Sequence, residues 1–70
     1  MGTVLIFKST HDVIKARRAL DKARLDYEIV PTPKAVSSEC GMSLRVSELN
    51  LEQARILLQA AEVRYRDDLL

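Results

Sequence analysis

The sequence contains a single cysteine, Cys40, and a single histidine, His11, and these two side chains have the greatest chemical potential in the chain. The thiolate form of cysteine attacks electrophiles and accepts sulfur, and a cation or a helix N-terminus favours that form. We therefore expect Cys40 to be either a reactive thiol or a small apolar residue packed where a loop meets a strand. His11 and Lys34 are the candidate cations, and Gly41 would allow a tight backbone turn beside the sulfur and leave room for a reactant.

Hydroxyl side chains accompany both of these residues in the sequence. Ser9 and Thr10 directly precede His11, where they would cap a helix or leave its free N–H groups to hold an anion. Ser38 follows another serine just before the cysteine, and we expect both to form loop hydrogen bonds rather than act as nucleophiles. His11 is either a solvated residue of the first helical turn or a proton donor and acceptor for the thiol.

The first half of the chain predicts a strand followed by a helix. Residues 2–7 are β-branched and aromatic, as in a buried central strand. Ser9 and Asp12 have the spacing of a capping box, so a helix should span residues 10–24. Its apolar residues recur at the spacing of one buried face, namely Val13, Ala16, Leu20 and Ala23.

The second half repeats this order after a loop. Residues 27–30 alternate before Pro31, residues 31–41 form the longest irregular stretch, and residues 42–46 alternate again. Asn50 and Gln53 suggest a second capping box and a second amphipathic helix, and residues 63–66 suggest a fourth strand. We find no sequence repeat between the two halves.

This order, β-α-β-β-α-β, predicts one α+β domain over residues 1–70 with a ferredoxin-like fold. Right-handed crossovers would place both helices on one face of a four-stranded antiparallel sheet. The first and second strands would then run parallel and end at the same end of the sheet. The loop that contains Cys40 should therefore lie beside Ser9, Thr10 and His11.

Composition limits the classes of partner and compartment. The chain has 70 residues, a net charge of +1 and 47% hydrophobic residues, which indicate a single globular domain without a dedicated nucleic-acid surface. One cysteine cannot form an internal disulfide, and no signal peptide or membrane-spanning run is visible. We expect a cytoplasmic protein that binds neither nucleic acid nor membrane and forms a homodimer through the open sheet face.

Several functions common on this fold need residues that the chain lacks. Metal carriers need a Cys-x-x-Cys pair where this chain has Lys8-Ser-Thr-His11, and zinc or iron–sulfur sites need more Cys or His ligands. RNA-recognition sheets need paired aromatic residues, and the central strands offer only Phe7. No Gly-rich phosphate loop is present, so we expect no metal and no cofactor.

Three segments together resemble a known family. These are Phe7-Lys-Ser-Thr-His-Asp12, then Pro31-Thr-Pro33, then Ser37-Ser-Glu-Cys-Gly41 with Leu44-Arg45 following. They are similar to the selenium/sulfur (Se/S) carrier protein-like family of short bacterial proteins. The resemblance spans essentially the whole chain, and it implies that Cys40 is the functional thiol with Ser9, Thr10 and His11 around it. The Cys-Pro-x-Pro element of SirA-like sulfur carriers is absent.

The leading hypothesis is a carrier, not an enzyme, that accepts sulfur or selenium on Cys40 as a persulfide or selenopersulfide. Its partners would be sulfur or selenium donor and acceptor proteins, with SirA-like carriers among the candidates. One alternative is a protein-interaction or regulatory module in which Cys40 only packs. Another is a thiol redox sensor in which Cys40 forms a mixed or intermolecular disulfide.

Overall fold

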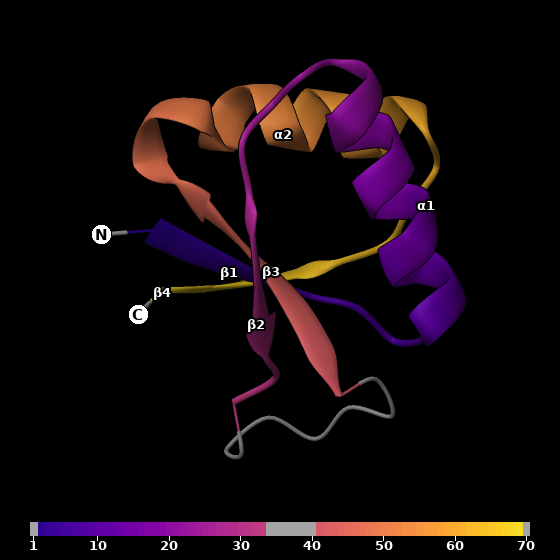
Figure 1. Ribbon diagram of the computed structural model, residues 1–70, viewed down its shortest axis with the longest axis vertical. Coiled ribbons are helices and arrows are strands. Elements are labelled where there is room, and N and C mark those ends of the chain that lie inside the picture. Colours follow the sequence, from indigo (N-terminus) through magenta and orange to yellow (C-terminus); the bar gives the residue numbers. More distant parts are fainter. Residues whose placement is uncertain (1, 34–40, 70) are drawn as a thin grey trace.

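The protein is a two-layer α+β domain, and the computed structural model describes residues 2–33 and 41–69. Four strands form one antiparallel sheet in the order β2-β3-β1-β4 within these residues. The elements are β1 (Gly2–Ile6), α1 (Thr10–Lys22), β2 (Glu28–Pro31), β3 (Met42–Ser47), α2 (Glu48–Ala60) and β4 (Arg66–Leu69) (Figure 1). The predicted ferredoxin-like fold is confirmed.

The core lies between the two helices and one face of the sheet. Leu5 and Phe7 on the β1 side and Leu44 and Val46 of β3 alternate along their strands, so all four point to the same face. They form one buried cluster with the apolar faces of both helices, which contribute Val13, Ala16, Leu20, Ala54 and Leu58. The helices therefore cover the same face of the sheet.

The opposite face of the sheet carries Val4 and Ile6 of β1 on its central strand. Both are buried, although no helix covers this face. Val4 lies opposite Arg45, and Ile6 lies between Ser43 and Arg66. Arginine stems can cover neighbouring apolar surface while their charged ends stay in water. The homodimer expected through this face remains a prediction, and it would have to use mainly polar contacts.

Helix α1 begins at Thr10 as predicted but ends at Lys22, two residues earlier than expected. Arg24 has a positive φ of 57°, which takes the backbone out of the helical conformation. Its N–H donates to the Asp21 carbonyl at 3.0 Å, and the Leu25 N–H donates to the Leu20 carbonyl at 2.9 Å. This pair of bonds is a Schellman motif, which satisfies the last helical carbonyls and buries Leu25 against Leu20.

Helix α2 differs more from the prediction. Its N-cap is Ser47 rather than Asn50, which instead lies in the first helical turn. The helix ends in a second Schellman motif: Glu62 has a φ of 59°, and the Val63 N–H donates to the Leu58 carbonyl at 3.0 Å. Because residues 63–65 return the chain from this helix end to the sheet, the strand predicted at 63–66 is wrong and β4 is Arg66–Leu69.

The two halves of the chain are related by a constant offset that we did not predict. The bounds of α2 and β4 lie 38 residues after those of α1 and β2 (48 minus 10, 66 minus 28). In the two central strands, Leu5 of β1 pairs with Leu44 of β3 at the centre of the sheet. The identities at this offset are Ser9/Ser47, Ala16/Ala54, Arg17/Arg55, Leu20/Leu58, Ala23/Ala61 and Tyr27/Tyr65.

Candidate functional site

The start of α1 lies at the same end of the sheet as the end of β2 and the start of β3. These two strands flank the segment that contains Cys40. Ser43, near the start of β3, pairs with Ile6 at the end of β1 on one side and with Val30 of β2 on the other. Helix α1 begins four residues after Ile6. In Figure 1 the start of α1, the end of β2 and the start of β3 all lie in the lower part of the molecule.

The first turn of α1 is closed by Ser9 in an extended conformation, with φ −143° and ψ 159°. Its Oγ accepts a hydrogen bond from the Asp12 N–H at 3.2 Å, and its carbonyl accepts one from the Val13 N–H at 3.2 Å. Ser9 therefore acts as the predicted cap. Thr10 and His11 follow it with exposed side chains. The carboxylate of Asp12 lies in the same turn and offsets part of the positive end of the helix dipole.

Two hydrogen bonds join the chain directly after β2 to the chain at the start of β3. The Thr32 N–H donates to the Gly41 carbonyl at 3.1 Å, which extends the ladder one pair beyond the strands. The Thr32 and Ser43 hydroxyls are 2.8 Å apart and share a hydrogen bond, and Ser43 is fully buried. These two residues were not predicted. The signal that could have found Ser43 is a small polar residue between two apolar positions of a central strand.

Gly41 is exposed, and the backbone bends there directly before β3. Its φ is not positive, and a Cβ added there would meet no atom of the described residues within 4 Å. The bend therefore does not use the left-handed conformation that favours glycine. Because Cys40 lies outside the described residues, the tight turn beside the sulfur and the room for a reactant remain predictions.

The structure places only part of the predicted thiol environment. Ser9, Thr10 and His11 occupy the same helix start, and Gly41 lies at the same end of the sheet. Cys40, Lys34 and Ser38 lie outside the described residues, so the predicted approach of the sulfur to α1 remains a prediction.

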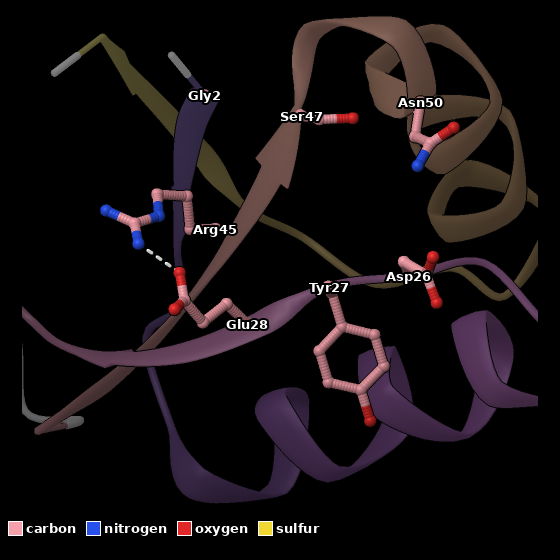
Figure 2. A pocket seen from close by; sticks show the side chains of 7 residues that line it. All are labelled: Gly2, Asp26, Tyr27, Glu28, Arg45, Ser47 and Asn50. Atoms are coloured by element: carbon pink, nitrogen blue, oxygen red, sulfur yellow. Dashed lines mark hydrogen bonds and ion pairs between the residues drawn. The ribbon is translucent and has the colours of Figure 1, made fainter.

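A shallow hollow lies at the opposite end of the sheet, where β1 begins and β3 ends. It has a volume of about 610 Å³ and is lined by Gly2, Asp26, Tyr27, Glu28, Arg45, Ser47 and Asn50. Figure 2 shows Arg45 paired with Glu28 at one side of the hollow, whereas the Tyr27 ring points toward α1. In this hollow Arg45 and Glu28 are paired with each other. The residues that line it include none of the predicted site residues Ser9, Thr10 and His11.

The described part of the chain offers neither a metal site nor a membrane-spanning helix. No group of three or more His, Cys, Asp or Glu residues there has the arrangement of a metal site. Neither helix in that part combines the length and the apolar composition needed to cross a membrane.

The fold and the helix start together define a small ferredoxin-like domain with a polar, open end. The chain belongs to the family described as "Putative Se/S carrier protein-like", which it matches over residues 3–67. The match covers both helices, β2 and β3 in full, β1 except Gly2, and the first two residues of β4. No curated protein and no solved structure matches the chain.

Proposed function

We propose that this protein carries sulfur or selenium on Cys40 and passes it to a partner protein. The observation that carries the proposal is the family match over residues 3–67, whose description names a selenium/sulfur carrier. The topology supports it, because Gly41, the residue after Cys40, lies at the end of the sheet where α1 begins. The chain has no second cysteine, so transfer would use one thiol only.

The transfer step is a thiolate exchange on sulfur. The Cys40 thiolate attacks the terminal sulfur of a donor persulfide, a new S–S bond forms to Cys40, and the donor S–S bond breaks. The donor leaves as a thiolate, which takes up the proton that Cys40 lost. Selenium transfer follows the same course from a donor selenopersulfide, with formation of an S–Se bond. No external oxidant or reductant is needed, because the transferred atom brings its oxidation state with it.

Activation of the thiol would be modest if the helix alone supplied it. A helix N-terminus stabilises a nearby anion by about 0.3–1 kcal/mol, which lowers a thiol pKa by less than about one unit. Asp12 reduces this contribution further, since its carboxylate occupies the first turn. His11 is exposed in that turn and is the residue that we expect to add a cation or proton donor.

Mass spectrometry after incubation with a cysteine desulfurase and isotopically labelled cysteine tests the proposal. We expect an adduct of one sulfur atom on the parent protein that maps to Cys40 and disappears with dithiothreitol. Cys40→Ser is the matched control and should acquire none. Absence of a Cys40 adduct with both sulfur and selenium donors would contradict the carrier proposal. A disulfide-linked dimer formed under mild oxidation without a donor would favour redox sensing instead.

The rate of Cys40 alkylation as a function of pH measures the activation directly. We expect the pKa of Cys40 to lie below the usual value of about 8.5, and to rise in His11→Ala. His11→Gln keeps a polar side chain without a titratable ring and separates charge from hydrogen bonding. Equal alkylation profiles in all three proteins would show that His11 does not act on the thiol.

A further inference from the structure

The free edge of strand β2 differs from the free edge of β4 at the far side of the sheet. These are the two outer strands in the order β2-β3-β1-β4, and the 38-residue offset makes Ile29 of β2 equivalent to Asp67 of β4. Asp67 forms an ion pair with Arg55 of α2. Ile29 instead leaves 46% of its surface exposed. Charged residues and prolines on edge strands oppose pairing with other chains. β4 has such a residue, Asp67, at the equivalent of Ile29, whereas β2 has its charged residue and its proline only at its two ends, Glu28 and Pro31.

The hydrogen-bond pattern shows which backbone groups face outward from β2. The Thr32 N–H donates to Gly41, which makes Thr32–Gly41 a hydrogen-bonded pair of the antiparallel ladder. Such pairs alternate along the strands, so Val30 and Glu28 also bond to β3, whereas the N–H and C=O of Ile29 point away from it. Pro31 faces outward as well, so its missing N–H costs this sheet nothing, although it leaves the edge with one donor fewer for a partner strand.

The side chains around Ile29 continue the apolar character of this edge. Ile14 of α1 is 42% exposed and Met42 of β3 is 38% exposed. Met42 pairs with Pro31 on the helix-covered face, diagonally from Ile29. Ile14 lies one turn before Arg17, whose Nε donates to the Tyr27 hydroxyl at 3.4 Å, so Ile14 is on the side of α1 that faces β2. The position equivalent to Ile14 in the other half holds a polar residue, Glu52.

We propose that the β2 edge pairs with the β2 edge of a second copy of this chain, in antiparallel orientation about a two-fold axis at Ile29. In that register the two Ile29 residues exchange both outward N–H···O=C bonds and bring their side chains together. Tyr27 lies across from Pro31 of the other copy, and Glu28 lies across from Val30. No like charges therefore face each other, and Glu28 is already paired with Arg45 of its own chain. The result is a continuous eight-stranded sheet.

Sedimentation velocity on the Cys40→Ser protein, from micromolar to millimolar concentration, tests this proposal without interference from intermolecular disulfides. We expect a monomer–dimer equilibrium with a dissociation constant in the micromolar range, because the paired strand is short. Ile29→Asp copies the residue that the other half has at this position and should weaken the dimer by at least about tenfold. Ile56→Asp is the matched control, because Ile56 is 59% exposed on α2, and it should leave the equilibrium unchanged.

A crosslinking experiment keeps the proposal testable if Ile29→Asp does not fold. In the Cys40→Ser background, Ile29→Cys gives a chain whose only thiol is at the proposed axis, and a short bis-maleimide should link two copies efficiently. Ile56→Cys in the same background should link poorly. A monomeric parent protein at millimolar concentration would overturn the proposal, as would a dimer that Ile29→Asp leaves intact. Neither result would bear on sulfur transfer, which is measured separately on Cys40.

Discussion

At the scale of single residues, the two glycines of the chain have opposite requirements for space. A Cβ at Gly2 would lie 2.9 Å from the Val46 carbonyl oxygen and 3.1 Å from the Arg45 Cγ. The Val46 oxygen belongs to the backbone of a central strand, which cannot move without disturbing the sheet. A Cβ at Gly41 would meet no atom of the described residues within 4 Å.

We therefore expect Gly2→Ala to lower the free energy of unfolding by about 1–3 kcal/mol through overpacking. Gly41→Ala should change it by less than about 0.5 kcal/mol, as at other exposed sites. Urea denaturation of the two variants and the parent measures both effects. Equal stability of the two variants would show that the start of β1 is farther from β3 than this structure has it.

At the scale of elements, the equivalent arginines Arg17 and Arg55 each tie a helix to the segment of chain that follows it. In the first half the Arg17 Nε donates to the Tyr27 hydroxyl, which in turn donates to the Asp21 carboxylate at 2.8 Å. In the second half Arg55 forms an ion pair with Asp67 of β4. These groups are partly exposed, so we expect each tie to contribute less than about 1 kcal/mol.

The ion pair of Arg55 and Asp67 should affect the titration of Tyr65, because both charges act on its phenol. Burial raises the pKa of the Tyr65 phenol above its usual value of about 10, the Asp67 carboxylate raises it further, and the Arg55 guanidinium lowers it. The pKa of Tyr65 is therefore higher in the folded protein than in the unfolded chain. The stability that the neutral Tyr65 phenol contributes is complete below pH about 10 and is lost as pH rises through the folded pKa.

Phenolate absorbance in a Tyr27→Phe protein isolates this group, since the chain has two tyrosines. We expect a midpoint above pH about 10 that moves down in Asp67→Asn, where the repelling charge is removed. A midpoint that moves up in that variant would show that Asp67 is not close to the phenol.

At the scale of the whole molecule, the sequence pattern predicted the order of the elements but not all their limits. The first helix start was predictable because Ser9 both caps and precedes the apolar repeat. The second start was not, because Ser47 caps α2 without a side-chain hydrogen bond and Asn50 mimics a cap three residues later. The last strand was misplaced because Val63 and Tyr65 alternate like strand residues, whereas Val63 completes a helix end.

The candidate site was predictable only where backbone topology decides it. Right-handed crossovers bring the start of α1 and the start of β3 to one end of the sheet, and this follows from element order alone. The Thr32–Ser43 contact depends on the register of two strands that are separated by a long loop, and nothing local specifies that register. The internal repeat is hard to see in the sequence because most of its non-identical pairs differ in character, as Ile14/Glu52 and Ile29/Asp67 do.

The centre of the sheet should also be the centre of stability. Leu44 is fully buried and pairs with Leu5 and with Ile29, so it joins the two halves of the sheet and the helix layer. Truncation of such a leucine to alanine costs about 2–5 kcal/mol. A 70-residue domain has a total stability of about 4–10 kcal/mol.

Leu44→Ala should therefore remove a large share of the folding free energy, and it should lower the thermal midpoint markedly. Leu49→Ala is the matched control, since Leu49 is 95% exposed, and it should change stability by less than about 0.5 kcal/mol. Thermal and urea unfolding followed by circular dichroism measure both variants. Equal losses would mean that Leu44 does not face the helices. A one-residue shift in β3 would produce that result. It would also separate Ser43 from Thr32 where β2 ends and β3 begins.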